Sequence, residues 1–250
     1  MAKVLEICVD SLASARAAIA GGADRLELCS ALLAGGLTPY EILLRQIREE
    51  SDIPIRCLMR HRAGDFLYPR EERELLRRQI LQLKAAGADG FVIGCLTPEG
   101  DLDMDAMKPL VETCDGKGIT LHRCIDVSAD PEQTYLDAMA LGIDTVLTSG
   151  AAPSCTAGME TIRKLVALRD LHNGPEVLVG AGVNAGVIAR FLTEIPGVRA
   201  FHMSGKTELE SCMRFRRDGI PMGLPGLDEW HIQQTDPSAV RAALDVLTRG

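Results

Sequence analysis

The sequence predicts an α/β fold, a (β/α)8 TIM barrel formed by a single domain over residues 1–250. The first observation behind this prediction is a repeated phrase, in which a helix ends on glycine and a short aliphatic strand follows. The phrase occurs at 21–29, 87–93 and 142–148, and more weakly at 197–202. Because glycine adopts the left-handed conformation that ends helices at little cost, each copy indicates a short link from a helix into a strand. Such a repeat is typical of a parallel sheet wound with helices.

The second observation is the spacing of eight aliphatic segments, which begin at intervals of roughly 20 to 35 residues, as βα units do. Most are near-continuous aliphatic runs, as expected for strands covered on both faces. The expected strands are residues 4–9, 25–29, 55–60, 90–95, 119–125, 145–149, 176–181 and 198–203. The turn at 9–12 has no glycine-rich phosphate loop. Its absence disfavours an open doubly wound sheet and predicts no nucleotide cofactor.

Helix start signals separate these strands. Residues 38–41 read Thr-Pro-Tyr-Glu, a capping box with proline at the first helical position. Residues 130–133 and 236–237 show a similar helix-start pattern with proline. In the third helix, a stripe of aliphatic residues at helical spacing is expected to pack in the core: Leu76, Ile80 and Leu83. One long connection, at about 205–235 between the eighth strand and the last helix, is expected on the functional face.

Composition excludes several classes of partner. The net charge of −8 and the lack of a basic stripe with aromatic residues predict no binding to nucleic acid. No stretch of about 18 apolar residues occurs, which predicts no membrane span. The start of the chain has no apolar signal region, and its eight cysteines are scattered. We therefore expect a cytoplasmic protein with reduced thiols.

Six titratable side chains interrupt the aliphatic strands. Charges there are expected to face the lumen or its mouth, because pointing them at the helix layer would cost heavily in desolvation. The six are Glu6, Glu27, Arg60, His122, Asp126 and His202. The candidate catalytic residues among them are Glu6, Glu27, His122, Asp126 and His202, and Asp126 is expected to orient His122 from the same strand. The alternative is a structural network of ion pairs.

A small anion is expected to bind at the same strand ends. Arg60 and Arg62 follow the third strand, and arginine pairs with phosphate or carboxylate through two hydrogen bonds. The loops after the sixth, seventh and eighth strands add hydroxyl groups and backbone amides, as in other barrels of this type. The residues expected there are Thr148, Ser149, Gly180, Gly182 and Ser204.

Two cysteines are candidate metal ligands. Cys8 and Cys29 each follow a strand glutamate by two residues, so both thiols are expected on the glutamate side of neighbouring strands. Two thiolates in a sheltered site suit a soft ion such as Cu(I). The alternative is that both cysteines are small buried hydrophobic residues.

With these residues assembled, the chain resembles the CutC family, described as copper homeostasis proteins. The matching phrases are LEICVDS (5–11), GGADRLELCS (21–30), GGLTP (35–39), RAGDF (62–66), HR..D (122–126), LTSG (147–150), GAGV (180–183) and MRFR (213–216). The chain departs from the family at His61, usually proline, and at Ala63, usually glycine. The resemblance implies a TIM barrel in the cytoplasm that forms a homo-oligomer, a dimer or tetramer.

Three functional hypotheses follow. The first is a copper homeostasis protein of CutC type that binds Cu(I). The second is a TIM-barrel enzyme, a hydrolase or lyase, acting on a small anionic metabolite through the acid and base groups at the strand ends. The third is a barrel that binds a partner protein, for which the sequence offers no exposed apolar or charged run.

Overall fold

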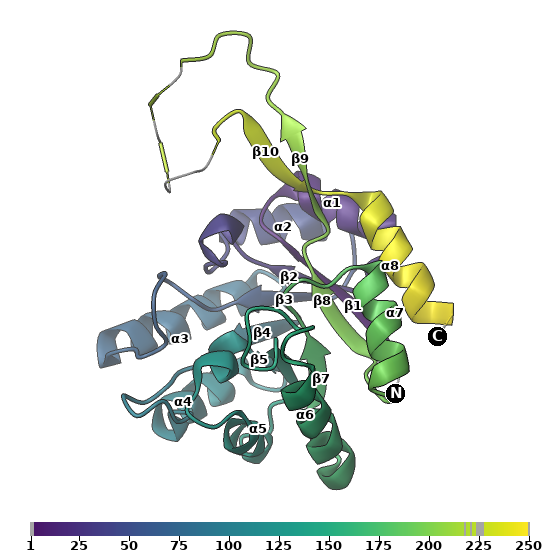
Figure 1. Ribbon diagram of the computed structural model, residues 1–250. Coiled ribbons are helices and arrows are strands. Elements are labelled where there is room, and N and C mark those ends of the chain that lie inside the picture. The colour runs from purple at the N-terminus through teal and green to yellow at the C-terminus, as the bar shows by residue number, and fades with distance from the viewer. Residues whose placement is uncertain (1–2, 218, 221, 224–227, 250) are drawn as a thin grey trace.

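A computed structural model describes residues 3–217, 219–220, 222–223 and 228–249 (Figure 1). In this part of the chain, eight parallel strands close into a barrel in sequence order, with β8 paired to β1. The strands are β1 (Val4–Val9), β2 (Arg25–Leu28), β3 (Ile55–Leu58), β4 (Gly90–Ile93), β5 (Gly118–Leu121), β6 (Thr145–Thr148), β7 (Glu176–Val179) and β8 (Ala200–Met203). The predicted fold class is therefore confirmed.

Helices surround the barrel on its outer side (Figure 1). They are α1 (Leu12–Gly21), α2 (Glu41–Glu50), α3 (Arg70–Ala85), α4 (Met104–Cys114), α5 (Pro131–Ala140), α6 (Met159–His172), α7 (Ala185–Glu194) and α8 (Pro237–Arg249). The expected stripe on α3 is buried in the core, with Leu76, Ile80 and Leu83 each at most 2% exposed. None of the helices that the structure describes is long and apolar enough to cross a membrane.

One of the predicted helix caps is confirmed and another is wrong. Asp130 accepts hydrogen bonds from the amides of the first turn of α5, which begins with Pro131. Thr38, in contrast, does not cap α2, whose N-cap is Tyr40 without a side-chain hydrogen bond. The Thr38 hydroxyl instead accepts the Arg60 N–H at 3.0 Å, and the Thr38 N–H donates to the Arg60 carbonyl at 2.8 Å. The threonine therefore holds the chain at the end of β3 in place.

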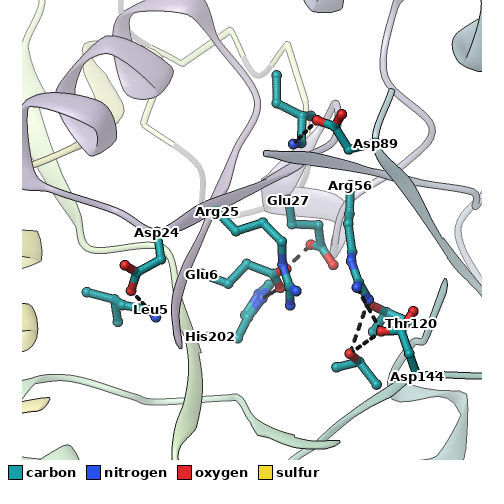
Figure 2. A network of polar contacts seen from close by, with 12 residues as sticks. Leu5, Glu6, Asp24, Arg25, Glu27, Arg56, Asp89, Thr120, Asp144 and His202 are labelled. Carbon is teal, nitrogen blue, oxygen red and sulfur yellow. Dashed lines mark hydrogen bonds and ion pairs between the residues drawn. The ribbon is translucent and has the colours of Figure 1, made fainter. Parts of the chain in front are cut away.

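The repeated phrase that predicted the fold has a second structural role. In three copies an aspartate precedes the strand, and its carboxylate accepts the backbone N–H of a residue on the strand before it. Figure 2 shows the contact between Asp24 and Leu5. The donors and acceptors are Leu5 with Asp24, Ile55 with Asp89, and Ile119 with Asp144, at 2.8, 2.9 and 2.5 Å. Each of these carboxylates aligns the start of one strand with its neighbour.

The N-terminal end of the lumen is filled by Arg56 from β3. Its guanidinium donates to Thr120, Thr145 and Asp144, at 2.6, 3.1 and 2.7 Å (Figure 2). Two strand glycines make room for it, because a Cβ at Gly90 would lie 2.9 Å from the Arg56 Cγ and one at Gly118 would lie 2.7 Å from its Nη2. This end is therefore packed with polar contacts.

One connection differs from expectation, and a second contains strands that the sequence did not predict. The fifth strand was expected at 119–125, but β5 ends at Leu121 and the chain turns into a 3₁₀ helix, η2 (Arg123–Val127). The long connection at 205–235 contains an antiparallel hairpin of β9 (Lys206–Glu210) and β10 (His231–Thr235), which extends away from the barrel (Figure 1). Residues 218, 221 and 224–227 of this connection lie outside the described residues.

The expected homo-oligomer stays a prediction.

We predict that Asp144→Ala destabilises the protein by about 1–3 kcal/mol, because it removes the acceptor of the Ile119 amide and a partner of Arg56. Urea unfolding followed by circular dichroism measures the change. Asp245→Ala is the control, because among the described residues the Asp245 carboxylate is paired with Arg249 alone, on the surface of α8, and we expect little change there. Equal losses in the two variants would contradict this role for Asp144.

Candidate functional site

A cavity of about 630 Å³ opens at the C-terminal end of the barrel. Its apolar lining includes Leu32, Leu58, Phe66, Leu147 and Val183. The predicted site residues that line it are Cys8, Glu27, Arg60, His122, Asp126, Gly182, His202 and Ser204. The structure thus brings most of the predicted site to one cavity.

Cys8, Glu27 and His202 form a compact group on one side of this cavity. One potential ligand atom from each residue lies within 4.8 Å of the other two. The three residues come from β1, β2 and β8, which are neighbours in the barrel, and Cys8 is directly opposite Glu27 in the strand register. A thiol, a carboxylate and an imidazole at this spacing are a candidate set of metal ligands.

Glu6 lies beneath this group rather than in the cavity lining where it was expected. It is fully buried, and its Oε1 is 2.8 Å from Nδ1 of His202 (Figure 2). Its Oε2 accepts from Nε of Arg25 at 2.5 Å. This leaves the Nε2 of His202 on the side of Glu27, 3.9 Å from its Oε2. A histidine held by a carboxylate through one ring nitrogen, with the other nitrogen facing the ligand group, is the usual arrangement around a metal.

The charges of these residues depend on one another. Burial alone would raise the pKa of Glu6, but Arg25 and His202 outweigh it and lower that pKa to about 2. Burial raises the pKa of Glu27 to about 7. For His202, burial opposes protonation, yet Cys8, Glu27 and Glu6 raise its pKa well above its ordinary range. At neutral pH, Glu6 is therefore ionised, and its charge favours the protonated form of His202.

Cys29 is more deeply buried than Cys8. Its thiol is fully buried against Leu58 and Val92, and its Sγ is 3.5 Å from the Val9 carbonyl oxygen. Burial raises the pKa of this thiol far above its ordinary value. Cys29 is not among the residues that line the cavity. Joint binding of Cu(I) by Cys8 and Cys29 stays a prediction.

His122 lies in the cavity lining but is not part of the group formed by Cys8, Glu27 and His202. Its Nδ1 accepts the Cys124 N–H at 3.2 Å, and its ring packs against Phe66 with 4.6 Å between the centroids. Burial and the charge of Arg60 lower the pKa of His122 to about 3. The imidazole is therefore neutral near pH 7, and because Nδ1 is an acceptor, its proton is on Nε2.

The expectation that Asp126 orients His122 is wrong. Because β5 ends before these residues, Asp126 is on η2, where its carboxylate accepts from Thr148 Oγ1 at 2.5 Å and from the Ser149 N–H at 2.9 Å. It also pairs with Arg123 at 2.7 Å. Asp126 thus holds the loop after β6, and no carboxylate of the described residues is bonded to the imidazole of His122.

The predicted anion-binding residues divide into two sets. Arg60, Gly182 and Ser204 line the cavity, whereas Arg62, Thr148, Ser149 and Gly180 are not among its lining residues. Arg62 pairs with Glu72 and Asp65. The hydroxyl groups of Thr148 and Ser149 donate hydrogen bonds to the Asp126 carboxylate. The sequence showed these residues near strand ends but did not show that their polar groups were already partnered.

Comparison with known proteins gives a consistent result. The model of the CutC family matches residues 3–207. A relative from Xanthomonas campestris pv. campestris (strain 8004), named family protein CutC, is 45% identical over 243 residues, or 97% of this chain and 98% of that protein. A relative of the same name from Vibrio parahaemolyticus serotype O3:K6 is 40% identical over 238 residues, or 94% and 95% of the two chains.

A solved structure agrees with these relatives. A protein from Streptococcus agalactiae, described as a candidate copper homeostasis protein CutC, is 26% identical to this chain, with a TM-score of 0.75. The match covers 81% of this chain and 98% of that one.

The fold and the site define a (β/α)8-barrel protein with a buried group of thiol, carboxylate and imidazole at its strand ends. Within that class, the chain belongs to the CutC family. The resemblance seen in the sequence is therefore confirmed. The grouping of Cys8 with His202 could not be read from the sequence, because it depends on the register of β8 and β2 against β1, which places His202 opposite Glu6 and Glu27 opposite Cys8.

We predict that Glu6→Gln destabilises the protein by about 3–5 kcal/mol near pH 7, because it leaves Arg25 without its buried partner. The folded-state pKa of Glu6 lies below its ordinary 4.5, at about 2. Its ionised form therefore stabilises the fold above about pH 4.5, and this contribution is lost as the pH falls towards 2. Denaturant unfolding of parent and variant at several pH values should show the difference shrinking over that range.

Glu74→Gln is the control for this prediction. The pKa of Glu74 is also lowered to about 2, by hydrogen bonds from Arg77 and Arg78, but the group lies on the surface of α3. Solvent screens such pairs, so we expect little change in stability. A Glu6→Gln variant as stable as the parent across the whole range would contradict the role given to Glu6.

Proposed function

We propose that this protein acts in copper homeostasis and binds Cu(I) at the cavity, through the Cys8 thiolate and the Nε2 of His202. The observation that carries the proposal is the approach of Cys8, Glu27 and His202 within 4.8 Å. Support also comes from the family and from the description of the Streptococcus agalactiae protein.

The chemistry of the ligands fits copper. Thiolate is a soft ligand that selects Cu(I), and imidazole suits copper as well. The Glu6 carboxylate would hold the imidazole of His202 in its ligating orientation. Binding would displace the proton of His202, so affinity is expected to fall as the solution becomes more acidic.

The bonds that Asp126 makes bear on the enzyme hypothesis. A hydrolase or lyase in which Asp126 activates His122 conflicts with the bonds that Asp126 makes to Thr148 and Ser149. No comparable conflict arises for metal binding at Cys8. The copper hypothesis is therefore the one that the geometry supports best.

We predict that Cys8→Ser lowers the affinity for Cu(I) by more than the roughly 10- to 100-fold that loss of an outer-shell partner costs. Competition with a chromogenic Cu(I) chelator under reducing conditions measures this affinity. Glu6→Gln should lower it by the smaller factor. Cys212→Ser is the control, because Cys212 is an exposed thiol in the connection between β9 and β10.

Cys29→Ser separates the two possible ligand sets. A loss as large as that of Cys8→Ser would show that Cys29 is the second thiolate ligand, as the sequence predicted. An unchanged affinity would leave Cys29 as a core residue and support His202 as the partner of Cys8. If Cys8→Ser and Cys212→Ser bind Cu(I) as tightly as the parent, the proposed site is wrong.

A further inference from the structure

Arg60 is a fixed cation beside the cavity without an acidic partner. Its Nη1 donates to the carbonyls of Ala34 and Gly36, at 3.2 and 3.0 Å, and its Nη2 to the carbonyl of Gly64, at 3.1 Å. Among the ion pairs of the described residues, none includes Arg60, and its Nε is buried without a hydrogen-bond partner. Neutral carbonyls orient a guanidinium but do not cancel its charge.

The cation is held in place before any ligand binds. Thr38 bonds the backbone of Arg60 at both its N–H and its carbonyl. The ring of Phe66 lies 5.6 Å from the guanidinium carbon, within the range of a cation–π contact. Binding of a ligand to Arg60 would therefore cost little conformational entropy of the arginine side chain.

His122 adds a second unpartnered donor to the same side. It is 4% exposed, and its Nε2 has no hydrogen-bond partner among the described residues. A Cβ at Gly94 would lie 2.5 Å from the Cε1 of the imidazole, so the edge that carries Cε1 and Nδ1 packs on that glycine. A buried donor left without an acceptor costs about 1–3 kcal/mol, and a ligand that accepts its hydrogen recovers part of that cost.

We propose that Arg60 and His122 form a binding site for the anionic group, carboxylate or phosphate, of a small organic molecule. This goes beyond copper binding, because the site is built from β3, η2 and their loops rather than from Cys8 and His202. The neighbouring Leu58 and Phe66 give the body of such a molecule an apolar surface. The ligand class is therefore a small molecule with one anionic end and an uncharged body.

Arg123 provides a matched control in the same cavity. It also lines the cavity, but its charge is already paired with Asp126 and it donates to Ser149. Lys206, a further cation of the lining, is exposed, so solvent screens its charge. His202 also lines the cavity, and Glu6 lies 2.8 Å from its Nδ1 as a partner for its charge. The proposal thus requires that Arg60 and Arg123 differ in their effect on anions.

The test is titration of the metal-free protein with inorganic phosphate and, separately, with butyrate, a monocarboxylate with an uncharged body, using calorimetry. We expect one of the two anions to bind, with an affinity about 10- to 100-fold lower in Arg60→Met. Arg123→Met and Cys212→Ser should bind it as the parent does. Tighter binding of one of the two probes identifies the anionic group of the ligand as phosphate or as carboxylate. Binding of neither anion, or equal losses in Arg60→Met and Arg123→Met, would overturn the proposal.

A measurement on the parent protein covers the case in which Arg60→Met does not fold. Nitrogen-15 NMR can follow the His122 Nε2 and the Arg60 Nε during the same titrations. We expect both signals to shift and to saturate at the same anion concentration. Signals that stay unchanged while the anion binds elsewhere would overturn the proposal, and the copper site would be unaffected by that result.

Discussion

The interaction on which the lumen of this barrel depends is the buried pairing of Glu6 with Arg25 and His202. The carboxylate is fully buried and meets residues of the two strands on either side of β1. An isolated charge in such a place would be very costly, so the three groups are stable only together. The pairing therefore joins the two strand neighbours of β1 and sets the charge of the residues above it.

The same pairing prepares the site. Because Glu6 holds one nitrogen of His202, the other nitrogen is directed to the level of Cys8 and Glu27. The cavity then has two unlike sides, since the thiol and carboxylate lie at β1 and β2 while Arg60 and His122 lie past β3 and β5. One side is suited to a soft metal ion and the other to an anion.

Glycine positions divide the lumen into a filled end and an open end. Gly90 and Gly118 leave space for Arg56, which bonds Thr120, Thr145 and Asp144 at the N-terminal end. At the other end, the loops after the strands enclose the cavity. Polar packing is thus concentrated in one end and the cavity in the other, the division that is usual for this fold.

Local pattern in the sequence determined the barrel, because glycine caps and aliphatic runs act over a few residues, and strand alternation placed Glu27 and His202 at the lumen. Only the tertiary structure decided which of them meet. The register of β8 against β1 brings His202 opposite Glu6, a contact between residues 196 apart in the chain. The early end of β5 turns Asp126 away from His122. The pKa of Glu27 and of His122 likewise follows from burial, which exists only once all eight strands exclude water from the lumen.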